Sequence, residues 1–178
     1  MTRPVLMVVG LGANLGRRLA SLRAARAALS QLAALRWASG VYETAPIGPK
    51  QPMFLNAAVL LECSLSPLDL LARSLEIERD QGRVRRERWG PRSLDLDLLW
   101  SDVSHASEQL QVPHPRLCDR AFALRPLLDV LLASGVASPA TLAHYSAALE
   151  RVGMLGVEAI AVTSEWRRIH TARLEVAN

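Results

Sequence analysis

Apolar and polar positions along the first half of the chain predict alternating strands and helices. An apolar run over residues 4–9 ends at a glycine-rich segment and predicts a buried strand. Leucines recur three, four and seven positions apart over residues 15–32, which predicts an amphipathic helix with Asn14 as its N-cap. The pattern over residues 36–44 predicts a second strand.

Prolines then interrupt the apolar pattern over residues 45–52 and predict a loop. A third strand is predicted over residues 53–63. The sequence Ser66-Pro67-Leu68-Asp69 combines a capping box with proline at the first helical position, and Gly82 ends the helix that follows.

The second half of the chain continues in the same way. We expect strands over residues 94–100, 110–112 and 157–163, helices over residues 116–132 and 138–153, and a polar loop over residues 103–109. The order strand–helix–strand–strand–helix–strand matches the split β-α-β layout. We therefore expect one α+β domain over residues 1–178, with helices on one face of a mostly antiparallel sheet.

Composition narrows the class of protein. The chain has 178 residues, 50% of them hydrophobic, which is typical of a single domain. Its two cysteines, Cys63 and Cys118, are too few for a disulfide framework and suit a reducing cytosol. No apolar run reaches the roughly 18 residues of a membrane span, and the N-terminus lacks a signal-peptide pattern. We expect a cytoplasmic protein with no membrane partner.

The formal net charge of +4 has a local origin. Residues 82–92 contain five arginines and one glutamate, and five minus one equals the whole excess. A nucleic-acid-binding protein would spread its basic residues over a face. One arginine cluster on a neutral chain favours a small polyanion, because guanidinium groups bind phosphate oxygens bidentately. Trp89 lies within the cluster, where its ring could stack on a flat ligand, and this favours a binding loop over a solvated one.

Asp95 and Asp97 follow this arginine cluster. Alternation along the predicted strand places both carboxylates on one face, about 7 Å apart. Alone, such a pair is typical of an acidic edge strand. Beside the arginines it favours a magnesium–polyphosphate site, because Mg²⁺ binds a few carboxylates together with phosphate oxygens.

Gly10-Leu11-Gly12-Ala13-Asn14-Leu15-Gly16 follows a predicted strand and precedes a predicted helix, as dinucleotide-binding fingerprints do. A dinucleotide fold would continue as a parallel sheet, whereas here a second strand leads directly into a third. We favour a tight strand-to-helix turn. A nicotinamide-dependent oxidoreductase, from this segment, and a nucleic-acid binder, from the arginines, remain as alternatives.

The four histidines show no spacing typical of a zinc site. His114 lies between Pro113 and Pro115, which is compatible with a rigidly held ligand contact or with a surface turn.

Four groups of residues resemble the 6-hydroxymethyl-7,8-dihydropterin pyrophosphokinase family of folate biosynthesis. They are residues 10–16, residues 42–49 with 54–58, residues 83–99, and residues 112–116 with Arg120 and Phe122. The most specific is Arg88-Trp89-Gly90-Pro91-Arg92 followed by Asp95-Leu96-Asp97. The resemblance covers about residues 4–130, whereas residues 134–178 match weakly. Departures from the common pattern stand at Met53, Ala45, Leu75 and Pro115.

The resemblance implies a ferredoxin-like α+β fold and an enzyme that moves the β,γ-pyrophosphoryl group of ATP to the pterin hydroxymethyl oxygen, releasing AMP. We expect the chain to be a monomer. It implies two Mg²⁺ ions on Asp95 and Asp97, with Arg83 and Arg92 as further catalytic residues. The implied ATP contacts are Glu78, Arg85, Trp89, His114 and Arg120. The implied pterin contacts are Thr44, Ala45, Ile47, Phe54, Asn56, Trp89 and Phe122.

Overall fold

The computed structural model describes residues 3–82, 90–162 and 166 of the chain. Within them, a six-stranded sheet has the order β5-β1-β4-β3-β8, and β2 pairs with β4 beside β3. Every one of these pairings is antiparallel. The strands are β1 Val5–Ala13, β2 Ala34–Ala38, β3 Val41–Thr44, β4 Phe54–Cys63, β5 Asp95–Ser101 and β8 Val157–Ile160. A separate small sheet pairs β6 His105–Ala106 with β7 Gln111–Val112.

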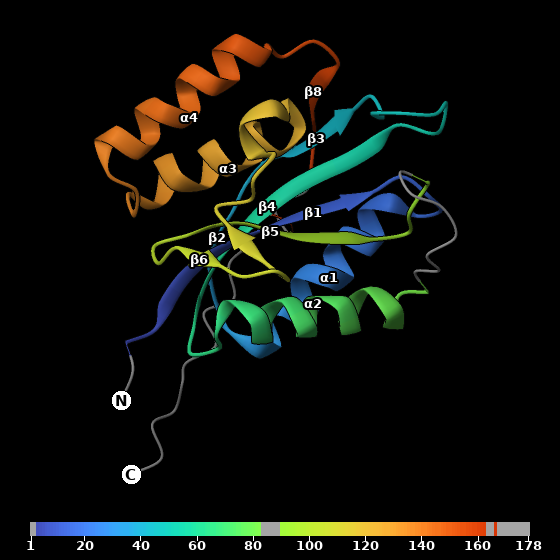
Figure 1. Cartoon of the computed structure of the whole chain (residues 1–178). Coiled ribbons are helices and arrows are strands. Elements are labelled where there is room, and N and C mark those ends of the chain that lie inside the picture. The colour runs from blue at the N-terminus through green and yellow to red at the C-terminus, as the bar shows by residue number, and fades with distance from the viewer. Residues whose placement is uncertain (1–2, 83–89, 163–165, 167–178) are drawn as a thin grey trace.

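Helices cover both faces of the sheet (Figure 1). They are α1 Arg18–Leu32, α2 Pro67–Asp80, α3 Ala121–Ser134 and α4 Pro139–Val152, with a 3-10 turn at Leu117–Asp119 before α3. On β1, Met7 and Val9 pack with α1 and α2, whereas the intervening Val8 packs with α3 and α4. The α+β class with a mostly antiparallel sheet is confirmed. The expectation that helices lie on one face is wrong, because the central strands are apolar on both faces.

The glycine-rich segment does not form the predicted turn. β1 continues through Gly10 and Gly12 to Ala13, and α1 begins only at Arg18. Asn14 is therefore not the N-cap, which is Arg17. A dinucleotide fingerprint requires a turn directly after a parallel strand, so both the position of the glycines and the antiparallel sheet disagree with that alternative.

Other element boundaries differ in detail. The strand predicted over residues 36–44 is two strands separated at Ser39 and Gly40. The helix predicted from residue 116 begins at Ala121, and β6 lies within the predicted polar loop. The capping box is confirmed, because Oγ of Ser66 accepts a hydrogen bond from the Asp69 amide at 3.1 Å. Among the described residues, no helix has both the length and the hydropathy to cross a membrane.

Candidate active site

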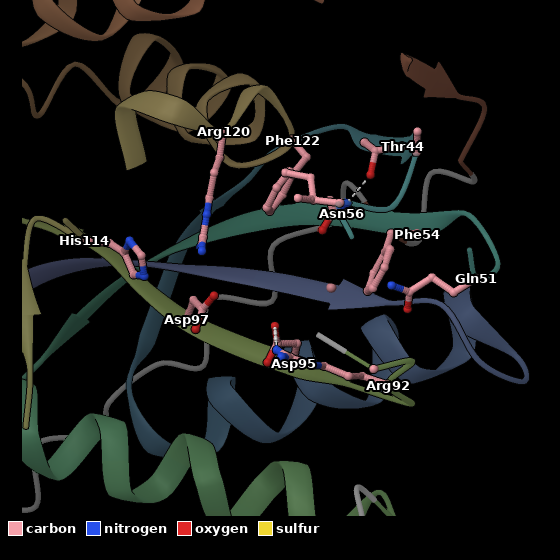
Figure 2. Close-up of a pocket in the computed structure, with 14 residues that line it drawn as sticks. Thr44, Gln51, Phe54, Asn56, Arg92, Asp95, Asp97, His114, Arg120 and Phe122 are labelled. Atoms are coloured by element: carbon pink, nitrogen blue, oxygen red, sulfur yellow. Dashed lines mark hydrogen bonds and ion pairs between the residues drawn. The ribbon is translucent and has the colours of Figure 1, made fainter. Parts of the chain in front are cut away.

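A cavity of about 240 Å³ lies where the ends of β1, β3, β4 and β5 meet the start of α3 (Figure 2). Its wall combines acidic, basic, amide and aromatic side chains from these separate elements. The residues that line it are Gly12, Thr44, Ala45, Ile47, Gln51, Phe54, Asn56, Gly90, Arg92, Asp95, Asp97, His114, Arg120 and Phe122.

Asp95 and Asp97 form the acidic side of the cavity. Both lie on the face of β5 opposite Leu96 and Leu98, which are buried against the α1–α2 side. This alternation confirms the predicted shared face. Burial and the charge of Asp95 raise the pKa of Asp97 to about 6, against the opposing effect of nearby arginines. The raised pKa of Asp97 reflects mainly its burial in the cavity wall, next to a second carboxylate.

The floor between the acidic and amide groups is Gly12. Its register partners are Asp95 on β5 and Asn56 on β4. A Cβ at Gly12 would lie 3.0 Å from Oδ1 of Asn56 and 3.8 Å from Cβ of Asp95. A glycine at position 12 therefore keeps the cavity open. This accounts for the glycine within β1, where no turn requires it.

Arg92, Arg120 and His114 supply the basic side. Nη1 of Arg92 donates to Oδ2 of Asp95, and the Arg92 amide donates to Oδ1 of Asn14 at 2.7 Å. Nε of Arg120 is buried without a hydrogen-bond partner among the described residues, and desolvation lowers the pKa of this guanidinium. Its side chain points from the start of α3 toward the acidic pair (Figure 2). A buried, unpaired donor of this kind indicates an anionic ligand.

His114 is held in one orientation. Its amide donates to the Leu99 carbonyl at 2.9 Å, and its Nδ1 accepts from the Arg116 amide at 3.1 Å. Burial, assisted by Arg120, lowers the pKa of His114, so the ring is neutral at pH 7. With Nδ1 accepting, the ring proton lies on Nε2, which makes His114 a hydrogen-bond donor toward a ligand.

The other end of the cavity suits a flat, polar heterocycle. Nδ2 of the buried Asn56 donates to Oγ1 of Thr44 at 2.7 Å, which fixes the amide plane and leaves Oδ1 as an acceptor. Phe54 at the start of β4 and Phe122 on the first turn of α3 bring aromatic rings to the same end (Figure 2). Aromatic faces beside a fixed amide are a common way to bind such rings.

Of the expected site residues that the structure describes, Glu78 alone does not line the cavity. It is buried on α2, and its Oε1 accepts a hydrogen bond from the Leu96 amide at 2.7 Å, between the two aspartates. Arg83, Arg85 and Trp89 lie outside the described residues.

Sequence reasoning missed the cavity-lining role of Gln51, Gly12 and Gly90. Gln51 accepts at Oε1 from Nδ2 of Asn14 at 2.9 Å. Its position in a proline-containing loop gave no chemical signal, since only the fold brings that loop to the end of β1.

Residues 8–132 match the family model described as 7,8-dihydro-6-hydroxymethylpterin-pyrophosphokinase. The 2-amino-4-hydroxy-6-hydroxymethyldihydropteridine pyrophosphokinase of Bacillus subtilis is 46% identical over 126 residues, covering 68% of this chain and 75% of the relative. The Pseudomonas putida protein of that name is 49% identical over 109 residues, covering 60% and 91%.

Solved structures agree in fold. Wild-type HPPK-DHPS of Plasmodium falciparum, crystallised with SDX-DHP, superposes with a TM-score of 0.64 at 12% identity. The match covers 91% of this chain and 49% of the other, so the chain spans about half the length of that protein.

Proposed function

Since this chain belongs to the 7,8-dihydro-6-hydroxymethylpterin-pyrophosphokinase family, we propose how its cavity carries out the reaction of that family. The enzyme transfers pyrophosphate from ATP to 6-hydroxymethyl-7,8-dihydropterin and releases AMP, a step of folate biosynthesis. The observation that carries the assignment of residues is one cavity with paired carboxylates at one end and a fixed amide between aromatic rings at the other.

Asp95 and Asp97 fit Mg²⁺. They offer hard carboxylate oxygens from one strand face, and no group of three acidic, histidine or cysteine side chains among the described residues forms a complete metal cage. That donor set suits a cation which completes its coordination with phosphate oxygens and water. We propose two ions, as the family resemblance implies. Bound there, Mg²⁺ would neutralise charge on the transferred phosphate groups.

Arg92, Arg120 and His114 are the proposed phosphate contacts at the described end of the cavity. Each brings donors to the acidic pair from a different connecting segment, before β5, after β7 and before α3, so together they would surround a triphosphate seated over β5. Glu78, Arg83, Arg85 and Trp89 keep the ATP-binding and catalytic roles that the resemblance implies, as proposals.

The pterin is proposed to lie between the rings of Phe54 and Phe122. Oδ1 of Asn56 would accept from the pterin amino edge, and the backbone of residues 44–47 would read the remaining donors and acceptors. In this orientation the hydroxymethyl group faces the acidic pair. Trp89 is the further pterin contact that the resemblance implies.

The proposed chemistry is an in-line displacement. The pterin hydroxymethyl oxygen forms a bond to the β-phosphorus of ATP as the bond from that phosphorus to the α,β-bridging oxygen breaks. AMP leaves with the bridging oxygen, and the hydroxyl proton passes to water. Positioning and charge neutralisation by the residues above are sufficient, because phosphoryl-type transfer needs no covalent nucleophile.

The test is to incubate the purified chain with ATP, Mg²⁺ and 6-hydroxymethyl-7,8-dihydropterin and to separate the nucleotides. We expect AMP and pterin pyrophosphate in equal amounts, and none when Mg²⁺ is chelated. Formation of ADP in place of AMP would contradict transfer of an intact pyrophosphoryl group.

We also propose that the chain acts as a monomer in the cytoplasm, with residues 1–178 forming one pyrophosphokinase domain. Its two cysteines are free, which is compatible with a reducing compartment. Sedimentation at several concentrations measures the mass, and a dimeric mass would contradict the monomer.

A further inference from the structure

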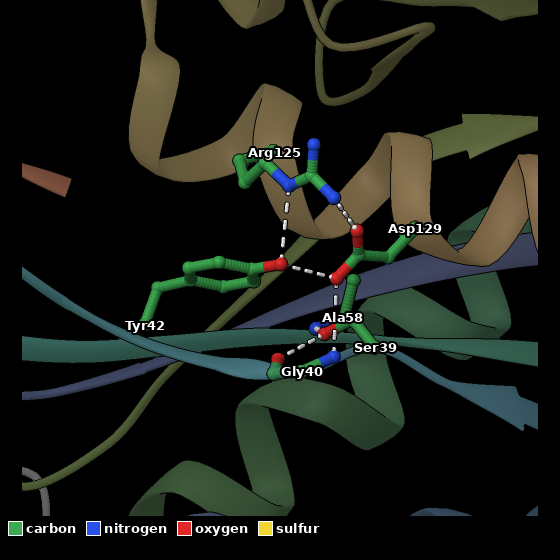
Figure 3. A network of polar contacts seen from close by, with 6 residues as sticks. All are labelled: Ser39, Gly40, Tyr42, Ala58, Arg125 and Asp129. Carbon is green, nitrogen blue, oxygen red and sulfur yellow. Dashed lines mark hydrogen bonds and ion pairs between the residues drawn. The ribbon is translucent and has the colours of Figure 1, made fainter. Parts of the chain in front are cut away.

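Tyr42, Arg125 and Asp129 form a polar network between β3 and α3 (Figure 3). The Tyr42 hydroxyl donates to Oδ2 of Asp129 at 2.5 Å and accepts from Nε of Arg125 at 3.1 Å. Nη2 of Arg125 donates to Oδ1 of Asp129 at 2.5 Å. The Gly40 amide, just before β3, donates to Oδ2 of Asp129 at 3.2 Å. The network thus joins the helix to the strand by polar contacts of fixed direction.

The network is specified in detail. Tyr42 is 7% exposed, and its hydroxyl uses both its donor and its acceptor capacity. A Cβ at Gly40 would lie 3.3 Å from the Tyr42 hydroxyl and 3.4 Å from Oδ2 of Asp129, so a side chain there would crowd the contact. Phenylalanine at position 42 would provide the same packing. The two hydrogen bonds of the hydroxyl therefore fix the orientation of β3 relative to α3, which apolar packing alone would not do.

Both ends of the network lie close to the proposed pterin-binding residues. Tyr42 is the register partner of Asn56 and lies two residues before Thr44 on the same face of β3. Arg125 follows Phe122 by three residues, so it lies one turn along the same side of α3. The network therefore ties the strand pair that carries the amide edge to the helix that carries an aromatic wall.

Resting on the function proposed above, we propose that Tyr42 and Asp129, bridged by Arg125, are positioning residues for the pterin. They set the separation between the Phe122 ring and the Asn56–Thr44 edge. Stacking is sensitive to this separation, because a gap of about 0.5–1 Å already forfeits a quarter to a half of a dispersion contact. β5, which carries the acidic pair, is separated from β3 by β1 and β4, and of the proposed phosphate contacts at the described end of the cavity Arg120 alone lies at the start of α3, so ATP binding depends less on the network than pterin binding does.

The experiment compares Tyr42→Phe, Asp129→Asn and the double variant with the wild-type chain. Titration calorimetry measures the Kd of 6-hydroxymethyl-7,8-dihydropterin and, separately, that of ATP with Mg²⁺. Tyr145→Phe is the matched control, since Tyr145 is a buried tyrosine of α4 on the same side of the sheet and does not line the cavity. Thermal unfolding of each variant reports the loss of stability.

We expect Tyr42→Phe to raise the pterin Kd at least fivefold and the ATP Kd less than twofold. Asp129→Asn should act in the same direction. The double variant should be no worse than Tyr42→Phe alone, as two residues of one unit are not additive. Tyr145→Phe, which removes a buried hydroxyl outside the network, should leave the pterin Kd unchanged. If Tyr42→Phe does not fold, Asp129→Asn decides by the same two constants.

A pterin Kd within twofold of wild type in the folded variants would overturn the proposal and leave the network a structural role. Equal increases in both Kd values would also overturn it, because they would mean general loosening. Neither result depends on turnover. Failure of the wild-type chain to form AMP would instead contradict the proposed function.

Discussion

Nη1 of Arg92 donates a hydrogen bond to Oδ2 of Asp95 at 2.5 Å, inside the cavity. The residue proposed to contact the triphosphate is thus paired with a residue proposed to hold the metal. Oδ1 of Asn14 separately fixes the Arg92 backbone through its amide. Loss of the Arg92 side chain should therefore change the charge of the site more than the backbone conformation around residue 92.

Arg92→Ala should lower kcat by about 100-fold or more, the usual cost of removing one preorganised donor to a developing charge. KM for ATP should rise much less, because the contact strengthens in the transition state. Steady-state kinetics at two salt concentrations checks this. Arg36→Ala is the control, since the Arg36–Glu62 pair lies on the surface of β2 and β4, and both constants should stay within about twofold. A pure KM effect in Arg92→Ala would contradict the prediction.

Asp97→Asn should abolish AMP formation while the chain stays folded. Asparagine removes a proposed metal ligand, and it also removes the like-charge repulsion between Asp97 and Asp95 that burial makes costly. In buffer without Mg²⁺ the melting temperature of the variant should equal or exceed that of the wild-type chain. Nucleotide analysis and thermal unfolding give the two readings. A wild-type rate at saturating Mg²⁺ would exclude Asp97 as a ligand.

Tyr145 should make folding sensitive to alkaline pH. Burial raises the pKa of Tyr145 from 10.0 to about 12, so the folded chain favours the neutral phenol. Stability from this group is complete below pH 10, where the phenol is neutral in both states, and is lost as pH rises from 10 toward 12. Tyr145→Phe cannot ionise and should therefore lose less stability over that interval. Urea midpoints at pH 8 and pH 11 measure the difference, and parallel curves would contradict it.

Trp166 should contribute strongly to stability although it follows the residues that match the family model. Its side chain is fully buried with the α1–α2 core, and its Nε1 donates to the Ser39 carbonyl at 2.8 Å. Trp166→Ala should cost about 3–5 kcal/mol, the range for truncating a buried aromatic side chain. Trp37→Ala is the control, because Trp37 is 40% exposed on β2, and it should cost less than about 1 kcal/mol. Equal urea midpoints for the two variants would contradict the burial of Trp166.

Local pattern carried the prediction of the acidic pair. Alternation along a strand depends only on backbone geometry, so Asp95 and Asp97 could be assigned to one face from the sequence. Asn14 shows the limit of the same approach. The position of Asn14 before a helical pattern predicts an N-cap. In the fold, Oδ1 of Asn14 instead accepts a hydrogen bond from the distant Arg92 amide.

The face covered by α3 and α4 was harder to predict. A continuous apolar run does not tell on which faces of the sheet helices will pack. The sequence therefore could not show that α3 and α4 cover the face opposite α1 and α2. Glu78 illustrates another limit. The family resemblance implies a nucleotide contact for Glu78, whereas in the structure Oε1 of Glu78 accepts a hydrogen bond from the Leu96 amide on β5.

This last hydrogen bond has a consequence for association between copies of the chain. In the part of the chain that the structure describes, β5 is one of the edge strands of the sheet, and an open edge can recruit a strand from another molecule. The Leu96 amide is already bonded to Oε1 of Glu78, and the Leu99 carbonyl accepts from the His114 amide. An incoming strand would have to displace a buried carboxylate before it could pair. The strand that carries the two aspartates is thereby protected against aggregation by strand addition.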